Sequence, residues 1–487
     1  MKKNLAWYDF ITINLFWLGM NIRNTAVGSI LLPYLVDSFV NPQVKNSALG
    51  AISTAGLIIA MLVQPAAGLW SDRSGSRFGR RRPFIFVGVL FDVIFLIAIG
   101  LSGSFGMLLV VSLFQQFSAN ISHGPLQGLI PDLVPEEQRG RASGVKALME
   151  LLPLILVAFT VAKLVGAGQI GWAIFATCAG LVITMILTVI FVKEQPLSQE
   201  QVRELRGTPF WPPMLRVLGV LAGIALGALA GLLGGGVIGG LAGLLTRAFA
   251  GAQTAWGVAV GLGGMAAMAV AVVAGVWGGA IVTLGQDARR NAPFTWWMVN
   301  RLMFMAAITS IQGFTPFFLM YAFGLTREEA ANQNGSLIMV VGLFTLVTAL
   351  LGGWLADRAG RRTLVALSGV ISAVGAFLLL TTVWVPNFTF LYLIGGILGL
   401  GTGLFMAVSW ALGTDLVPVG EAGRYLGISN LAGAGAGMIG KGIGGPVADY
   451  LNQIRPGLGY FAIFACYGVL FLLSIAALAG VKKQRAG

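Results

Sequence analysis

The feature that most constrains this chain is a series of apolar runs of about 20 residues, separated by short charged or turn-rich breaks. One α-helix of that length crosses the roughly 30 Å hydrocarbon core of a bilayer. The 487-residue chain is 57% hydrophobic and only 10% charged, against about 25% charged residues in soluble proteins. The runs are continuous rather than alternating, which excludes a transmembrane β-barrel. The sequence predicts an all-α polytopic membrane protein.

The composition also excludes most cofactor chemistry. His123 is the only histidine, and the two cysteines, Cys178 and Cys466, both lie inside apolar runs. These residues provide no zinc or haem ligand set and no disulfide framework. We therefore expect no metal, no cofactor and no catalytic residues, so the protein is not an enzyme. Membrane topology explains the net charge of +13 without a nucleic-acid partner, because the basic residues cluster between the apolar runs.

The breaks between the runs predict two sets of six helices. The first set, in residues 1–192, lies at about 9–36, 48–70, 84–102, 106–130, 143–165 and 171–192. The second set, in residues 285–487, lies at about 296–323, 334–355, 364–383, 389–412, 424–447 and 458–480. With a cytoplasmic N-terminus, 22 of the 31 Lys and Arg residues fall on cytoplasmic segments, as the positive-inside rule requires. We expect a plasma (inner) membrane protein with both termini in the cytoplasm.

Two charged motifs occur once in each half. Gly68-x-x-x-Asp-Arg-x-Gly-x-Arg is repeated from Gly353, and an Asp-Leu-Val-Pro motif follows each copy after 60 and 58 residues. Such a repeat indicates a duplicated six-helix bundle. An Asp at a helix end is able to pair with Arg across a short turn, which suits a gate that closes when cytoplasmic helix ends meet. The expected gate residues are Asp72, Arg73, Arg77, Arg80, Asp132, Arg141, Asp357, Arg358, Arg361, Asp415 and Arg424.

The duplicated Gly-x-x-x-Asp-Arg-x-Gly-x-Arg motif resembles the cytoplasmic signature of the major facilitator superfamily. Val63-Gln64-Pro65, the basic run 77–82 and the following Pro83-Phe84-Ile85 are similar to the sucrose:proton symporter branch, as is Asn120…Gly124-Pro125…Asp132-Leu133. The resemblance implies two six-helix bundles that alternate access to a central site for a sugar or glycoside carried with protons.

Residues 193–214 form a polar cytoplasmic loop, and residues 215–284 form a Gly-dense apolar insert. Because both copies of the motif must face the cytoplasm, the insert has to cross the membrane an even number of times. We predict two helices, at about 216–246 and 253–284, which brings the total to 14 transmembrane helices. The glycines between 227 and 240 offer faces for close helix packing, and we expect the insert to pack at the periphery.

Polar side chains inside the predicted helices are costly in a membrane and therefore need a function or a partner. Gln116, Asn120, His123 and Gln127 lie on one face of the fourth helix. Together with amides and aromatic rings on other helices they would line a cavity suited to sugar hydroxyls and pyranose faces, although each amide alone also suits a bond between helices. The expected substrate-binding residues are Trp17, Asn21, Asn24, Gln116, Asn120, His123, Gln127, Gln312, Trp410 and Asn430.

Proton coupling requires a carboxylate or histidine whose pKa changes as its surroundings become wet or dry. Plant-type sucrose symporters carry an acid and an arginine in the fourth helix, where this chain has Gln116 and Gln127. Coupling therefore falls to Asp92 or Glu150, and the spacing of Lys146 and Glu150 also suits a permanent ion pair. The expected coupling residues are Arg23, Asp92, Lys146, Glu150 and Lys441.

The sequence thus predicts a secondary active transporter that moves a sugar-like solute with H+. A carrier of another solute, such as a drug exported by proton antiport or an organic anion held near Arg23 and Lys441, is the alternative. A membrane-embedded enzyme or receptor is disfavoured, because Asp72 and Asp357 are surrounded by arginines rather than by a second metal-binding acid. The expected partners are the solute, protons and the lipid bilayer, with the chain acting as a monomer.

Overall fold

The computed structural model describes residues 5–194, 200, 204, 210–417 and 422–481, without the side chains of residues 357 and 422–434. Every regular element in this part of the chain is a helix. Twelve helices of the described residues are long and apolar enough to cross a membrane. This number is two fewer than the fourteen predicted crossings. Two other long helices, α1 (Trp7–Ala26) and α18 (Ala422–Ile454), do not belong to the twelve. Helix α1 carries Asp9, Arg23 and three asparagines, and α18 lies partly among the undescribed side chains.

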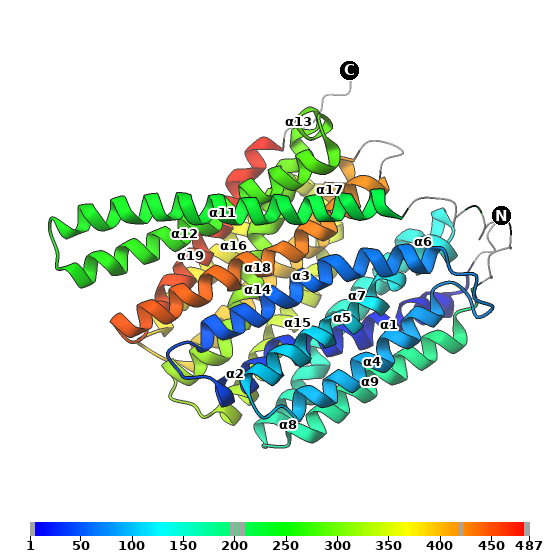
Figure 1. Cartoon of the computed structure of the whole chain (residues 1–487), viewed down its shortest axis with the longest axis horizontal. Helices are drawn as coiled ribbons and strands as arrows, with labels where there is room; N and C mark the ends of the chain where they lie inside the picture. Colours follow the sequence, from blue (N-terminus) through cyan, green and yellow to red (C-terminus); the bar gives the residue numbers. More distant parts are fainter. Residues whose placement is uncertain (1–4, 195–199, 201–203, 205–209, 418–421, 482–487) are drawn as a thin grey trace. The chain divides into compact units, whose positions relative to one another are not determined.

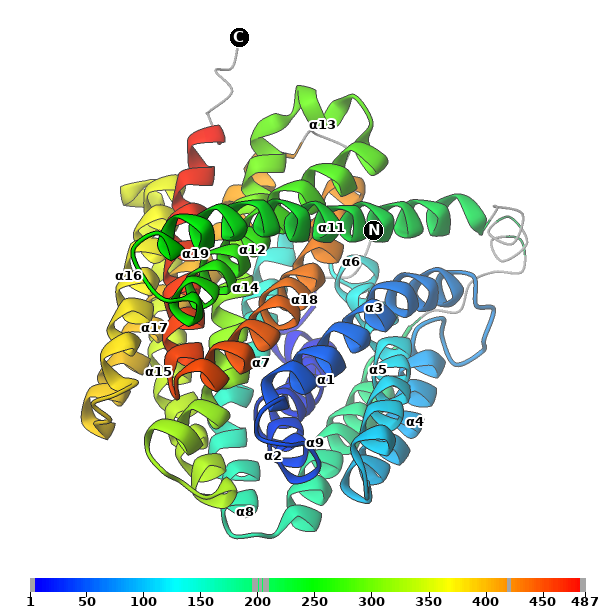
Figure 2. The same ribbon diagram turned by 60° about the vertical axis from the view of Figure 1, so that its left-hand side comes forward.

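Packing divides the chain into two compact units. Unit 1 contains Met1–Leu35, Ile58–Val217 and Ala331–Met339. In it α1 packs against α7 and α9, and α4 packs against α5 and α9 (Figures 1 and 2). Gly88 of α4 allows this close approach, since its Cα faces the backbone of Ser122 on α5. Its elements after α1 are η1 (Val27–Leu31), α4 (Arg82–Gly100), α5 (Phe105–Gln127), α6 (Leu129–Leu133), η2 (Glu136–Gln138), α7 (Arg139–Phe159), α8 (Val161–Gly166) and α9 (Ile170–Phe191).

Unit 2 contains Val36–Leu57, Leu218–Ala330 and Val340–Gly487. Its central helix is α14 (Ala292–Ala322), in which 78% of an 18-residue apolar stretch is buried. Phe304 of this helix stacks on Phe405 and meets Phe471 edge-on, which joins three helices through aromatic packing. The other elements are α11 (Trp211–Arg247), α12 (Ala252–Leu284), α13 (Asp287–Arg290), α16 (Arg361–Thr382), α17 (Phe388–Asp415), α18, α19 (Leu458–Ala477) and η3 (Leu478–Gly480). The boundaries at 192, 214 and 284 remain a prediction, because the two units follow packing rather than sequence order.

The insert forms a helical hairpin of α11 and α12 (Figure 1). Gly227, Gly231 and Gly235, spaced by four residues, face the backbone of α12 so closely that a Cβ at any of them would clash. Gly236 and Gly240 meet nothing within 4 Å and face away from α12. The predicted close packing through glycine is therefore confirmed for one face of α11. In turn, α12 packs along α18.

Four helices in the described part of the chain contribute to both units. The first residues of α3 (Lys45–Asp72), up to Leu57, belong to unit 2, whereas the rest of α3 belongs to unit 1. In α15 (Arg327–Ala359), residues Ala331–Met339 belong to unit 1 and the remainder to unit 2. The short helix α2 (Leu32–Phe39), which precedes α3, passes from unit 1 to unit 2 after Leu35, and α11 does so after Val217. These divided helices bring residues that are distant in sequence into one packed unit.

Candidate functional site

A charged pair lies at the centre of unit 1. The Arg23 guanidinium on α1 is 3.3 Å from the Asp92 carboxylate on α4, and both side chains are at most 4% exposed. Gln115 on α5 donates a hydrogen bond of 2.8 Å to the other Asp92 oxygen. Two charges held in an apolar bundle require this compensation, because an isolated charge there would be very unfavourable. The two residues that the sequence nominated separately thus act as one pair.

A second polar group surrounds Trp17 on α1. Lys146 and Glu150 of α7 form the predicted i,i+4 ion pair, with 3.0 Å between Nζ and Oε1. The Lys146 ammonium also lies 4.1 Å from the centre of the Trp17 ring, and His123 meets that ring edge-on at 5.5 Å. A cation thus occupies the indole face that we expected a sugar ring to use.

The predicted polar face of the fourth helix lies on α5. Asn120 donates to the backbone oxygen of Gln116 at 2.7 Å, and Gln127, which is exposed, lies 3.4 Å from a ring nitrogen of His123. On α1, Asn21 donates to the Trp17 carbonyl at 2.9 Å. These amide N–H groups are satisfied within their own helices, which leaves their oxygens as acceptors. Asn24, also on α1, is exposed.

Unit 2 contains the remaining nominated residues. Thr309 and Thr315, neighbours of Gln312 on α14, donate to carbonyls one turn earlier. The guanidinium of Arg301 lies 5.0 Å from the Trp410 ring centre. It therefore stacks on an aromatic face that the sequence predicts to contact substrate. The end of the Lys441 side chain lies against Gly313, where a Cβ would come within 2.8 Å of Nζ. The side chain of Asn430 lies outside what the structure describes.

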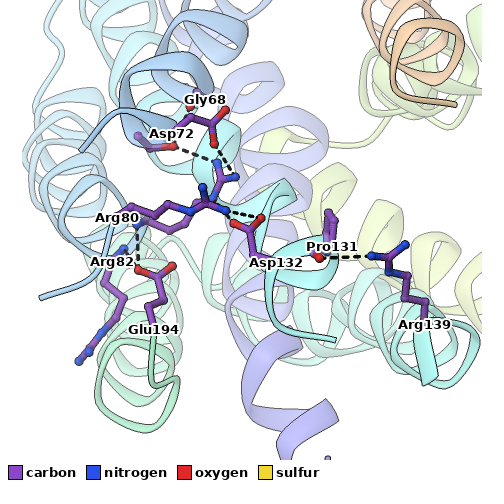
Figure 3. Close-up of polar contacts among 10 residues, drawn as sticks. Gly68, Asp72, Arg80, Arg82, Pro131, Asp132, Arg139 and Glu194 are labelled. Atoms are coloured by element: carbon purple, nitrogen blue, oxygen red, sulfur yellow. Dashed lines mark hydrogen bonds and ion pairs between the residues drawn. The ribbon is translucent and has the colours of Figure 1, made fainter. Parts of the chain in front are cut away.

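An arginine cluster connects the turn after α3 with the end of α5 and α6 (Figure 3). Arg81, which is not among the predicted gate residues, pairs with Asp72 at 2.6 Å and with Asp132 at 2.9 Å. It also donates to the Ser71 hydroxyl at 3.0 Å. Arg80 forms a further ion pair with Asp132. We call Ser71, Asp72, Arg80, Arg81 and Asp132 the arginine cluster.

Glu194 joins this cluster from the end of α9, as Figure 3 shows. Its carboxylate accepts hydrogen bonds from the backbone N–H groups of Arg81 at 2.9 Å and Arg82 at 3.4 Å, at the start of α4. Burial raises the pKa of Glu194, and the two backbone hydrogen bonds offset part of that rise. A carboxylate at a helix N-terminus also interacts favourably with the helix dipole.

The corresponding turn in unit 2 uses the same chemistry. Arg361 at the start of α16 pairs with Asp415 at 2.5 Å and donates to the Ala411 carbonyl at 3.0 Å. Arg358 stacks on Trp354, 3.9 Å from the ring centre. The side chains of Asp357 and Arg424 lie outside what the structure describes. In each six-helix repeat, an arginine in the turn after the second long helix thus pairs with an aspartate at the end of the fourth.

Three other arginines of the predicted gate lie near aromatic rings or at the surface. Arg73 lies 5.5 Å from the ring centre of Phe210, and Arg77 lies 4.9 Å from that of Phe78. Arg141 is exposed at the start of α7. The sequence missed Arg81, Gln115 and Glu194, because nothing in the basic run distinguishes one arginine from the next. Helical spacing also does not reveal that Gln115 faces α4.

Replacing Arg81 with Ala is expected to destabilise unit 1 by about 1–3 kcal/mol, because a largely buried guanidinium that serves three partners is lost. Thermal unfolding of the purified protein in detergent measures this loss. Arg77→Ala removes a guanidinium that lies over Phe78 and is the matched control, with a change within about 0.5 kcal/mol. Equal melting temperatures for the two variants would show that Arg81 does not hold the cluster together.

The raised pKa of Glu194 predicts a pH dependence of stability. An acid whose pKa is higher in the folded state binds protons more readily when folded, so its contribution to stability falls as the pH rises above the ordinary value of 4.5. Glu194→Gln keeps an acceptor oxygen but does not ionise. We expect this variant to gain thermal stability relative to wild type as the pH rises from about 4.5 through the raised value, with no further gain above it. Parallel pH profiles of wild type and variant would contradict the assignment.

Comparison with known proteins assigns the family. The family model described as "MFS/sugar transport protein" matches residues 17–282, and the model described as "Major Facilitator Superfamily" matches residues 224–440 and 297–485. The sucrose transport protein SUC3 of Arabidopsis thaliana is 28% identical over 210 residues, covering 36% of this chain and 35% of that protein. The proton-associated sugar transporter A of Homo sapiens is 30% identical over 168 residues, or 29% of this chain and 22% of that protein. The alignments thus span well under half of these relatives.

A multidrug resistance protein, MdtG of Enterobacter lignolyticus (strain SCF1), is 27% identical over 199 residues, covering 40% of this chain and 44% of that protein. Among solved structures, a D-xylose–proton symporter superposes with a TM-score of 0.65 at 15% identity and covers 99% of this chain and 100% of its own. This likeness establishes the fold alone. The matched families are membrane transporters and not enzymes. Because the first family model alone matches more than half of the chain, the chain belongs to the major facilitator superfamily of secondary transporters.

Proposed function

We propose that the protein is a secondary active transporter that moves a sugar or glycoside by alternating access and couples this movement to protons. The observation that carries the proposal is the polar interior of unit 1. There the Arg23–Asp92 pair lies buried in an apolar bundle. Lys146, which pairs with Glu150, and His123 both contact the Trp17 ring. Ionisable groups inside transmembrane helices typically mark transport pathways and proton relays.

Free hydrogen-bonding atoms support a hydroxyl-rich solute. Trp17 is 5% exposed, and its indole N–H has no hydrogen-bond acceptor among the described residues. A buried donor of this kind is unfavourable unless a ligand or water accepts its hydrogen bond. The amide oxygens of Asn21 and Asn120 add acceptors, so the site offers both roles that a sugar hydroxyl needs. We therefore keep Trp17 as a substrate residue, with its N–H rather than its ring face as the contact.

Glu150 is the better candidate for the coupling proton. Its side chain is 37% exposed, whereas that of Asp92 is 1% exposed and held by both Arg23 and Gln115. A proton is therefore able to reach Glu150 more readily, and its arrival would release Lys146, which also contacts Trp17. Asp92 then maintains the charge balance of Arg23. The lysine connects the proton site to the substrate site.

The orientation and topology are part of this proposal. By the positive-inside rule, the basic turns support a protein of the plasma (inner) membrane with both termini in the cytoplasm. We propose that α1 and α18 also cross the bilayer, which would give 14 crossings with the α11–α12 hairpin as the two additional helices. The chain would act as a monomer, and the arginine cluster and the Arg361–Asp415 pair would form a cytoplasmic gate.

A carrier of an organic anion or drug is the second candidate. Lys441 has no acidic ion-pair partner among the described side chains, and its end lies against Gly313 on α14. An unneutralised cation in the transport path would favour an anionic solute. The similarity to a multidrug resistance protein supports export as the direction in this case.

Transport by the purified protein in liposomes tests the proposal. With an inward proton gradient we expect a labelled disaccharide such as sucrose to accumulate, and an uncoupler to abolish its accumulation. A panel of monosaccharides, glycosides, organic anions and cationic drugs, each offered under gradients of both directions, separates the two candidates. Sugar uptake that ignores the gradient would eliminate proton symport, and uptake of anions or drugs alone would establish the second candidate.

A further inference from the structure

Among the described side chains of unit 2, the carboxylate of Asp449 on α18 accepts the most hydrogen bonds. It is 4% exposed and accepts four hydrogen bonds from the start of α3. Oδ1 accepts from the backbone N–H and side-chain amide of Asn46 at 3.3 and 2.7 Å. Oδ2 accepts from the backbone N–H and hydroxyl of Ser47 at 2.7 and 2.6 Å. Asp449 is 402 residues from Ser47 and 403 residues from Asn46 in the sequence, so these hydrogen bonds join two helices that are distant along the chain.

Asp449 takes the place of a helix cap. The first turn of a helix has backbone N–H groups without intrahelical acceptors, which a side chain at the preceding position usually satisfies. In α3 that position is Val44, whose carbonyl accepts the first helical hydrogen bond from Ala48 but whose side chain is apolar. The start of α3 is therefore capped from α18, and separating these helices would leave both sides with unsatisfied groups.

The helices are in close contact next to this cap. Gly445 of α18 faces the backbone of Asn46, and Gly50 of α3 faces the backbone of Lys441. The surrounding charges are satisfied elsewhere, since Lys45 pairs with Asp37 at 3.0 Å and Arg327 donates to the Ser38 hydroxyl at 2.5 Å. The Asp449 carboxylate is thus held by hydrogen bonds from the helix start rather than by a cation.

We propose that Asp449, Asn46 and Ser47 form a latch that holds α3 to α18 at the membrane face where α3 begins. The transport cycle has to break it to admit solute from that face. The inference rests on the proposed alternating-access function, and it assigns Asp449 as a positioning residue that does not contact solute. We call these three residues the Asp449 latch.

The corresponding region of α15 is attached in the same manner within unit 1. Asn334, which is 1% exposed, donates to the Ser29 carbonyl at 2.8 Å, and Gly335 faces Ala162 of α8. Ser29 lies in the π-helical segment η1, and such segments are frequent at functional sites. The second long helix of each repeat thus has its early residues tied by a buried polar side chain to helices of the other repeat.

Thiol labelling tests the latch without any solute. With Cys178 and Cys466 replaced by Ala, Thr54→Cys places a reporter on α3 whose side-chain position is buried against Gly442 of α18. A membrane-impermeant thiol reagent is added to liposomes from the face where α3 begins. Asp449→Asn replaces an acceptor by an amide donor opposite Ser47, and we expect labelling to be at least about tenfold faster than with Asp449 present.

A double variant separates tethering from capping. Val44→Asp supplies α3 with its own cap, so Val44→Asp/Asp449→Asn should recover thermal stability while labelling stays fast. Ser47→Ala removes one hydrogen bond and should accelerate labelling by a smaller factor, which provides a milder variant if Asp449→Asn fails to fold. Glu329→Gln is the control with unchanged labelling, because among the described residues the Glu329 carboxylate forms its hydrogen bond at the start of its own helix.

The outcomes are distinct. Fast labelling in both Asp449→Asn proteins supports the latch. The latch is overturned if Asp449→Asn leaves the labelling rate unchanged. It is also overturned if the Val44→Asp cap restores the slow rate. The result is independent of which solute is carried, so a wrong sugar assignment leaves the labelling pattern intact, and a failed latch leaves the transport assay intact.

Discussion

Asp92→Asn is expected to destabilise the protein by about 3–5 kcal/mol, the usual consequence of removing one member of a buried ion pair. Arg23 is 4% exposed, and without the Asp92 charge it would remain cationic in an apolar bundle. An asparagine has nearly the same shape and still accepts the hydrogen bond from Gln115. The loss of stability therefore measures the effect of removing the negative charge. Thermal or chemical unfolding in detergent measures this effect.

Two further variants make the Asp92 result specific. Arg23→Met/Asp92→Leu removes both charges and should recover most of the stability, since apolar replacement of a buried pair is often neutral or better. Glu136→Gln, which removes the 82% exposed partner of Arg139, should cost less than about 1 kcal/mol. If Asp92→Asn behaves like Glu136→Gln, the pair does not organise the bundle.

Glu150→Gln is expected to abolish solute accumulation against a gradient while preserving solute exchange. A glutamine accepts from Lys146 but carries no proton, so the proton gradient no longer drives the cycle. For one proton per solute the wild type should accumulate solute about tenfold per pH unit of gradient, and the variant should reach a ratio of about one. Uptake and counterflow measured on the same liposomes distinguish lost coupling from lost transport.

The control for Glu150 is Glu137→Gln, which removes an exposed acid in the turn before α7 and should retain full accumulation. Retained accumulation in Glu150→Gln would refute the assignment of Glu150 and leave Asp92 as the coupling acid. Loss of both accumulation and exchange would indicate instead that Glu150 positions Lys146 beside Trp17. Accumulation and exchange measured on Glu150→Gln thus distinguish coupling at Glu150 from coupling at Asp92.

Much of the fold was predictable, because membrane helices are encoded locally. Each of the fourteen predicted runs falls on helical residues, and most begin and end within a few residues of the expected position, as α12 does at Ala252–Leu284. The exceptions are α15, which begins at Arg327 rather than at 334, and α18, which ends at Ile454 rather than at 447. The Lys146–Glu150 pair also follows from helix spacing alone. The number of crossings was less secure, since α1 combines its apolar residues with Asp9 and Arg23.

The candidate site was only partly predictable. Arg23, Asp92 and Lys146 were identified because charges are rare in such helices, yet their partners were not. Nothing in the sequence shows that Lys146 covers the Trp17 ring or that Arg301 stacks on Trp410. These contacts depend on the rotation of each helix about its axis, which packing against neighbouring helices decides.

The sequence by itself determined the membrane class, the helix positions, the internal repeat and the unusual charges within helices. Those properties follow from hydrophobic length and local spacing, which the bilayer imposes on any chain. Only the tertiary structure decided that Asp92 pairs with Arg23, that Arg81 bonds to the acids of the arginine cluster, and that Asp449 caps α3. Each of these contacts joins segments that only the packing of helices brings within hydrogen-bonding distance, so no local pattern encodes them.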